Sequence, residues 1–137
     1  MLSLSCHCGD VRIETAKRPD FVNECNCGFC GKAGVWWGYF HPSEVAVEGA
    51  TSVYLRRDKD EPAAEMRFCA SCGALTHFTL TPDAAARFGN GVMGVNMRLA
   101  DENDLAGIEL RFPDGRAWPG HGDYGFVRPA RILGDGE

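Results

Sequence analysis

The chain contains seven cysteines, and all of them fall in three short clusters that read CHCG (residues 6–9), ECNCGFCG (24–31) and FCASCG (68–73). The C-x-C and C-x-x-C spacings direct neighbouring thiols at one centre, because residues two apart on a strand share a face and a tight turn brings residues three apart together. The glycines let the chain bend sharply, so that backbone N–H groups can face the sulfurs. Thiolates in this arrangement are typical ligands of zinc, and tetrahedral thiolate sites also accept iron. The clusters therefore predict metal binding, with zinc as the expected ion.

The odd number of thiols predicts two metal sites of different kinds. A structural zinc takes four protein ligands, whereas a catalytic zinc takes three and keeps its fourth position open. Seven thiols fit one site of each kind. Spacing alone allows two partitions: Cys6, Cys8, Cys69 and Cys72 closed with Cys25, Cys27 and Cys30 open, or Cys6, Cys8, Cys27 and Cys30 closed with Cys25, Cys69 and Cys72 open.

Other fates of the cysteines define the alternatives. A histidine that completed the second site would make both sites structural; His7 alternates away from its cysteine neighbours, which leaves His41, His77 and His121 as candidates. A single zinc with three incidental thiols is a further alternative. Disulfides fit poorly, because the cysteine count is odd and a C-x-C bridge is strained.

Composition and charge limit the class of protein. A length of 137 residues with 45% hydrophobic residues fits a single globular domain. The net charge of −5 argues against binding to nucleic acid or to an anionic membrane, since phosphate contacts need clustered Lys and Arg. The N-terminus lacks the pattern of a secretory signal, and no apolar run approaches the ~20 residues of a membrane helix. We therefore expect a cytoplasmic protein whose cysteines stay reduced.

The remaining sequence favours a mainly β protein with little helix. Alternation or β-rich composition predicts strands at 2–8, 11–13, 35–40, 45–47, 52–55, 75–80, 92–97 and 108–112, with Gly, Pro and Asp marking the turns. The best helix candidate follows Thr81, a suitable N-cap, with Pro82 at the first helical position. One further helical turn is expected after Cys27. Residues 129–137 are expected to form a loose tail, which places the domain at residues 4–128.

Together, the segments SCHCGDVRIE, ECNCGFCGKAG, MRFCASCGALTHF and GVNMRLAD resemble the glutathione-dependent formaldehyde-activating enzyme family, which is related to the centromere protein V domain. The resemblance covers residues from about 4 to about 114. It implies a β-tent fold of small antiparallel sheets around a structural zinc held by the first and third clusters, here Cys6, Cys8, Cys69 and Cys72. It also implies a catalytic zinc on the middle cluster, here Cys25, Cys27 and Cys30.

The resemblance further implies an activity and its partners. The expected reaction is that of a carbon–sulfur lyase: it adds a small thiol such as glutathione to formaldehyde or a related small aldehyde, giving S-(hydroxymethyl)glutathione in the family's case. The expected cofactor is zinc, with two ions per chain. Because three thiolates make a zinc electron-rich, such a site favours thiol chemistry over water activation. The alternative is a non-catalytic, zinc-stabilised binding module, as centromere protein V suggests.

Four residues near these segments are candidates for substrate binding. Lys32 lies two positions after Cys30 and could bind a substrate carboxylate, while Trp36 belongs to an aromatic run that could line a cleft. Asn96 and Arg98 belong to the VNMRLAD segment and could orient the substrate. Each has a structural interpretation as well: a solvated lysine, a core tryptophan, and polar side chains that tie strands together.

Overall fold

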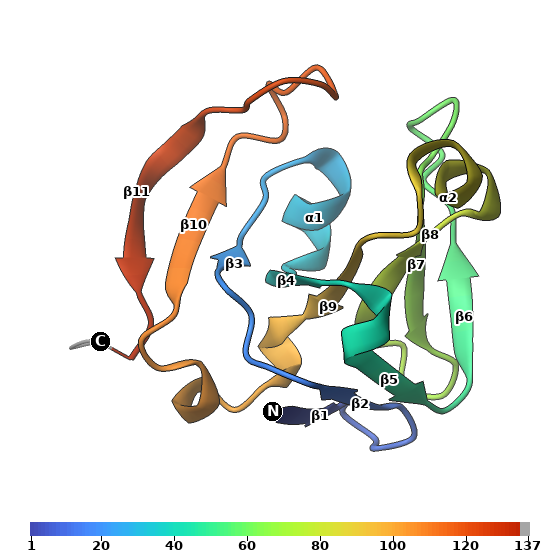
Figure 1. Ribbon diagram of the computed structural model, residues 1–137, viewed down its shortest axis with the longest axis vertical. Helices are drawn as coiled ribbons and strands as arrows, with labels where there is room; N and C mark the ends of the chain where they lie inside the picture. Colours follow the sequence, from blue (N-terminus) through green and yellow to red (C-terminus); the bar gives the residue numbers. More distant parts are fainter. Residues whose placement is uncertain (135–137) are drawn as a thin grey trace.

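The computed structural model describes residues 1–134, and most of their regular structure is β-strand, as the sequence predicts (Figure 1). The strands are β1 (Leu2–Ser5), β2 (Arg12–Thr15), β3 (Val22–Asn23), β4 (Trp37–Phe40), β5 (Val45–Glu48), β6 (Thr51–Tyr54), β7 (Ala64–Cys69), β8 (Leu75–Leu80), β9 (Met93–Asn96), β10 (Glu109–Pro113) and β11 (Phe126–Ile132). The α-helices are α1 (Gly28–Ala33) and α2 (Pro82–Phe88), and short 3-10 turns span Pro42–Glu44, Met97–Leu99 and Glu102–Leu105. Neither α-helix in this part of the chain is long enough to cross a bilayer.

The strands form two sheets of unequal size. The small sheet has the order β1-β2-β5, and the large sheet has the order β11-β10-β3-β4-β9-β8-β7-β6. The large sheet is wider than the small antiparallel sheets that the resemblance implied, and it contains one parallel pairing, between β10 and β3. No strand within residues 1–134 belongs to both sheets.

A shared core joins the two sheets. Buried and exposed residues alternate along β1 and β2, so the small sheet turns one face, with Leu4 and Ile13, towards the core. Val95 of β9 and Leu110 of β10 belong to the same buried cluster. Apolar burial therefore holds the small sheet against the large one, and Cys6 and Cys69 belong to the same buried cluster.

The predicted helix starts as expected. The Thr81 hydroxyl accepts a hydrogen bond from the Ala84 N–H at 3.1 Å, and Pro82 is the first helical residue. The helix ends at Gly89, whose φ of 84° is a conformation that favours glycine. The turn expected after Cys27 is also present, as α1.

Two sequence expectations are wrong. Cys6 and Cys8 do not continue β1: they lie in the turn that joins β1 to β2, where the Gly9 N–H donates to the Cys6 carbonyl at 3.1 Å. Residues 129–134 are not a loose tail, because 129–132 belong to β11 and Leu133 is buried in the core. Pro129 argued against a strand in this segment, because proline cannot donate a backbone hydrogen bond. The proline is tolerated because β11 is the edge strand of the large sheet. Residues 135–137 of the expected tail lie outside the described residues.

His77 is a titratable side chain buried within β8. Its Nδ1 lies 2.8 Å from the Thr76 hydroxyl oxygen, and that hydroxyl donates its only proton to the Arg67 carbonyl at 3.1 Å. His77 must therefore donate from Nδ1. Burial lowers the pKa of His77 from 6.5 to about 4, and the positive charge of Arg67 acts in the same direction.

The stability of the protein should consequently fall as the pH drops from 6.5 towards 4. In that window the unfolded chain binds a proton that the folded chain does not, so the free energy of unfolding should be about 2 kcal/mol lower at pH 5 than at pH 7 through His77 alone. The check is urea unfolding of wild type and His77→Gln at both pH values. Acid loss of metal affects both proteins equally, so an identical pH dependence in the two would contradict this role of His77.

Candidate active site

The first and third cysteine clusters meet in space. The Sγ atoms of Cys6, Cys8, Cys69 and Cys72 all lie within 4.8 Å of one another. The Cys6–Cys8 and Cys8–Cys69 sulfur separations are 3.7 and 3.6 Å. Zinc–sulfur bonds of about 2.3 Å in a tetrahedron require sulfurs about 3.8 Å apart, so the group fits a zinc ion. Of the two partitions that spacing allowed, the structure brings together the one that the resemblance implied.

Backbone N–H groups surround this four-thiol group. Cys6 Sγ accepts from the Val11 N–H at 3.3 Å, and Cys69 Sγ accepts from the N–H groups of Ser71 and Cys72 at 3.4 Å each. Hydrogen bonds from the N–H groups of Ala74 and Cys8 lower the pKa of Cys72 to about 6. These donors favour the thiolate form that a metal needs.

The middle cluster forms a second group, the three-thiol group of Cys25, Cys27 and Cys30, whose sulfurs also lie within 4.8 Å of one another. Cys27 is the N-cap of α1, and its Sγ accepts from the Cys30 N–H at 3.3 Å. Cys30 Sγ accepts from the indole N–H of Trp37 at 3.3 Å. Within residues 1–134 no histidine or carboxylate completes this group, so the histidine-closed alternative finds no support.

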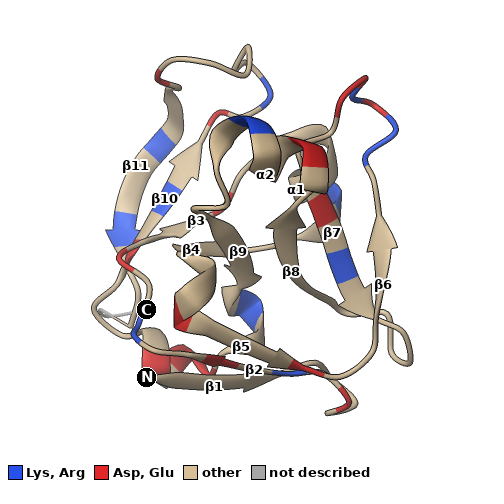
Figure 2. Ribbon diagram, turned by 45° about the vertical axis from the view of Figure 1, so that its right-hand side comes forward, with Lys and Arg blue, Asp and Glu red and all other residues tan. Residues whose placement is uncertain are grey.

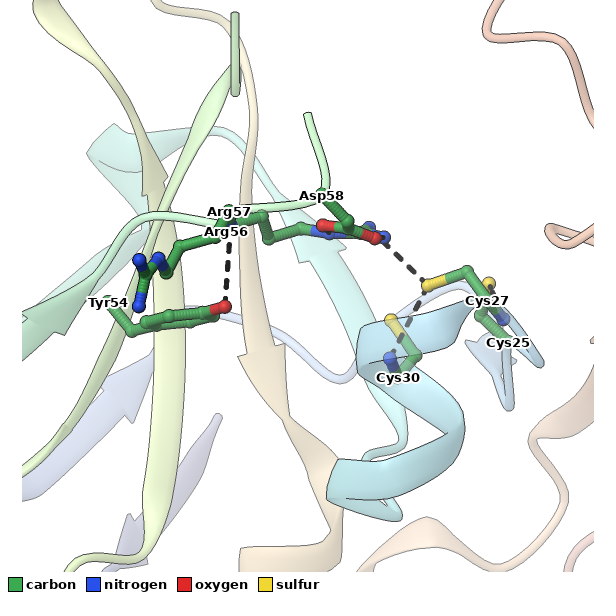
Figure 3. A network of polar contacts seen from close by, with 7 residues as sticks. All are labelled: Cys25, Cys27, Cys30, Tyr54, Arg56, Arg57 and Asp58. Atoms are coloured by element: carbon green, nitrogen blue, oxygen red, sulfur yellow. Dashed lines mark hydrogen bonds and ion pairs between the residues drawn. The ribbon is translucent and has the colours of Figure 1, made fainter. Parts of the chain in front are cut away.

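Arg56 places a positive charge beside the three-thiol group (Figure 3). Its Nη1 lies 3.5 Å from Cys27 Sγ, while its Nη2 pairs with Asp58 at 2.7 Å. Hydrogen bonds from the Cys25 and Cys30 thiols, together with the Arg56 charge, hold the pKa of Cys27 well below its usual range. The same shared contacts with Cys25 and Cys27 raise the pKa of Cys30. Cys27 is thus the thiol of this group that lies next to a positive charge.

The three thiols open into a cavity of about 460 Å³. One part of its lining is aromatic and consists of Trp37, Tyr39, Phe78 and Trp118. Another part comes from the loop between β6 and β7 and carries the charged residues Arg56, Lys59 and Glu61. Figure 2 shows acidic and basic residues close together along this loop. The volume lies in the range of small-molecule sites, so the thiols are placed where a ligand can reach them.

The loop between β10 and β11 packs closely against the three-thiol group. A Cβ atom built on Gly115 would lie 2.4 Å from Cys25 Sγ and 3.4 Å from Cys27 Cβ. Asn26, between those two cysteines, donates to Asp114 Oδ1 and accepts from the Arg116 N–H, both at 2.9 Å. Position 115 therefore requires glycine because a side chain would clash with Cys25, and not because the backbone adopts a special conformation.

Replacing Gly115 with alanine should displace Cys25 and weaken metal binding by the three-thiol group at least about tenfold, while leaving the fold intact. The measurement is competition of the protein with a zinc-binding indicator dye. Gly125→Ala is the matched control, because a Cβ on Gly125 of the same loop meets no atom within 4 Å. Equal zinc affinity of Gly115→Ala and Gly125→Ala would contradict the contact.

The structure places the four predicted substrate-binding residues outside the cavity lining. Asn96 Oδ1 accepts from the Trp36 and Arg98 N–H groups at 3.4 and 3.1 Å, and its Nδ2 donates to the Leu75 carbonyl at 2.8 Å. The Arg98 guanidinium lies 4.2 Å from the Trp36 ring centre and donates to the Gly34 carbonyl. In the described chain these contacts join the three residues to one another and to neighbouring strands.

Lys32 lines a separate groove of about 570 Å³ beside α1, together with Phe29, Tyr54 and Arg57. Sequence reasoning missed Arg56 and Trp118, which line the thiol cavity; Trp37 lies in the aromatic run that was expected to line a cleft, and it does line this cavity. Alternation predicts that the side chains of Trp36 and Trp37 point to opposite faces, but it cannot show which face holds the thiols. Arg56 and Trp118 lie on loops, where no periodic signal exists.

Comparisons with known proteins bear on the fold and the family of the chain. A crystal structure of a Rhodobacter sphaeroides protein superposes with a TM-score of 0.58 and 26% sequence identity, covering 78% of this chain and 97% of the other. No curated protein sequence matches the chain significantly. The family model described as "glutathione-dependent formaldehyde-activating enzyme" matches residues 1–107, a span that includes all seven cysteines. By this match over most of its length, the chain belongs to the glutathione-dependent formaldehyde-activating enzyme family.

Proposed function

We propose that this protein is a zinc-dependent carbon–sulfur lyase that adds a small thiol, such as glutathione, to formaldehyde or a related small aldehyde. The observation that supports this most directly is the three-thiol group, which opens into a cavity and has no fourth cysteine, histidine or carboxylate ligand among residues 1–134. The four-thiol group, by contrast, supplies a complete ligand set for a structural ion. The proposed location is a reducing compartment such as the cytoplasm, where such thiols persist.

The chemistry is an addition that needs no oxidant or reductant. The substrate thiol loses its proton, its sulfur bonds to the carbonyl carbon, the C=O π bond breaks, and the oxygen takes up a proton. Zinc held by Cys25, Cys27 and Cys30 would supply an exchangeable fourth position that favours the thiolate form of the incoming thiol. In the reverse reaction, the same preference of zinc for a thiolate would stabilise the departing thiolate.

Residues of this chain supply charge balance and orientation. Three thiolates and one zinc ion would carry a net charge of −1; Arg56, which also pairs with Asp58, lies 3.5 Å from Cys27 Sγ and offsets part of it. The Trp37 indole N–H fixes Cys30 Sγ in position at 3.3 Å. Holding both reactants in one cavity replaces a bimolecular encounter by a reaction between positioned groups, which can account for most of the rate gain.

The test is exchange NMR of isotopically labelled formaldehyde with glutathione, with and without zinc-loaded protein. We expect wild type to accelerate formation of the adduct at least about tenfold over the uncatalysed reaction, and Cys30→Ala not to accelerate it. Several other small thiols should be compared under the same conditions. If wild type and Cys30→Ala behave alike with every thiol, the lyase proposal fails, and a zinc-stabilised binding module becomes the better description.

A further inference from the structure

The loop between β10 and β11, residues 114–125 and here called the strap, lies beyond the part of the chain that matches the family model. It forms part of the wall of the thiol cavity through Gly115, Trp118 and Gly120. We propose that the strap makes the site selective for aldehydes with an aromatic or similarly bulky apolar group, with Trp118 as the specificity-determining residue. The identification of the bound group as an aldehyde rests on the proposed function.

The strap is anchored directly to the three-thiol group. Its first residue, Asp114, accepts from Asn26 Nδ2 at 2.9 Å, and the Asp114 N–H donates to the Gly125 carbonyl at the other end of the strap at 2.8 Å. Gly115 contacts Cys25 Sγ so closely that no side chain fits between them. The position of the strap relative to the sulfurs is therefore fixed by the hydrogen bonds that Asn26 makes with Asp114 and with the Arg116 N–H, and by one steric contact.

Aromatic contacts fix Trp118 within the strap. Its indole N–H donates to the Gly122 carbonyl at 2.9 Å, and its ring meets the Tyr124 ring edge-on, with centroids 5.4 Å apart. The Tyr124 hydroxyl is 3.5 Å from Asn23 Nδ2, which also donates to the Tyr39 hydroxyl at 3.3 Å. The buried Asn23 thus links the strap to Tyr39, another residue of the cavity wall.

Charged and aromatic residues of the cavity come from different segments. Arg56, Lys59 and Glu61 lie on the loop between β6 and β7, whereas Trp118 comes from the strap. Figures 1 and 2 both show this loop and the strap on either side of α1, which carries Cys30. A thiol substrate with polar or charged groups fits beside the charged loop. The aromatic wall is then available to the group attached to the carbonyl carbon of the aldehyde.

The size of the cavity agrees with this division. Formaldehyde has two non-hydrogen atoms and needs roughly one or two water volumes, ~30–60 Å³. The cavity volume is about 460 Å³. Trp37 and Phe78 meet edge-on with centroids 4.9 Å apart, so a part of the wall outside the strap also presents ring surfaces. Apolar rings pack well on such walls, whereas formaldehyde gains little from them.

Binding of 4-fluorobenzyl alcohol to the zinc-loaded protein tests the proposal without thiol or turnover. This probe carries the ring but cannot form imines with lysines, and fluorine NMR gives its dissociation constant directly. Trp118→Ala should weaken binding at least about fivefold, Trp118→Phe should restore most of it, and Phe88→Ala should leave it unchanged. Phe88 is a suitable control, since it is 75% exposed on α2 and does not line the described cavity.

Failure to detect saturable binding to wild type, or equal affinity of Trp118→Ala and Phe88→Ala, would overturn the inference. A second measurement compares catalysis with benzaldehyde and with formaldehyde. Trp118→Ala should lower the benzaldehyde rate relative to the formaldehyde rate at least about fivefold. If formaldehyde addition is accelerated but the two aldehydes respond equally, only the inference fails. If neither aldehyde reacts, the proposed function fails, and the binding measurement still decides whether Trp118 selects apolar rings.

Discussion

Replacing Cys69 with serine is expected to leave a chain that does not fold and holds no zinc at the four-thiol group. Cys69 Sγ is buried, accepts two backbone N–H groups and lies 3.6 Å from Cys8 Sγ. Zinc bound by such sites contributes on the order of 10 kcal/mol or more to folding, which equals or exceeds the whole stability of a domain of this size. Far-UV circular dichroism and zinc content measured after gel filtration check the expectation.

Ser71→Ala is the matched control for this substitution. Ser71 lies in the same turn, and its hydroxyl donates to Asp10 Oδ2 at 2.8 Å, but its side chain is not a metal ligand. Its loss should cost about 1 kcal/mol and leave the fold and the zinc intact. A folded Cys69→Ser protein that retains zinc at full stoichiometry would show that the four thiols are not a structural metal site.

The second large effect is expected at Cys27, where substitution should abolish catalysis and spare the fold. Zinc content should fall from two ions per chain to one, and the rate of adduct formation should fall to that of the uncatalysed reaction, because the remaining thiols of the group supply too few ligands. The four-thiol group is a separate cluster and should keep its ion. Zinc titration together with exchange NMR on the same samples checks both effects.

Two variants at Cys27 separate its two roles. Cys27 is also the N-cap of α1, so Cys27→Ala removes both a ligand and a cap, which should cost about 1 kcal/mol in stability. Cys27→Ser keeps an oxygen that can accept from the Cys30 N–H and should preserve the cap while still losing the zinc. If Cys27→Ser retained both ions and full activity, Cys27 would be a capping residue alone.

The grouping of the cysteines was predictable from the sequence only with help from the family resemblance. Spacing alone left two partitions, because each cluster contains pairs that can share a metal. What decides between them is the packing of the turn after β1 against the turn before β8, which is a tertiary contact between residues 61 positions apart. No local pattern encodes such a contact.

Strong local signals identified the elements that they govern, and weak ones did not. Thr81 and Pro82 marked the start of α2 because caps act within one helical turn. β3 was missed since two residues, Val22 and Asn23, are too few to show an alternation. β7 was overlooked although Glu65 and Arg67 alternate with Ala64, Met66 and Phe68 in the period-2 pattern of a strand, and the structure shows that these two charged side chains pair with each other at 2.9 Å.

The four-thiol group has a consequence for how the molecule assembles. The small and large sheets have no strand in common in the described residues, and this group takes two thiols from the turn of the small sheet and two from a turn of the large one. A metal ion bound there would act as a cross-link that closes a chain loop of about 61 residues. Closing such a loop costs ~3–4 kcal/mol of chain entropy. Docking of the first hairpin should therefore be a late event in folding, whose rate depends on free zinc and not only on the sequence of the hairpin.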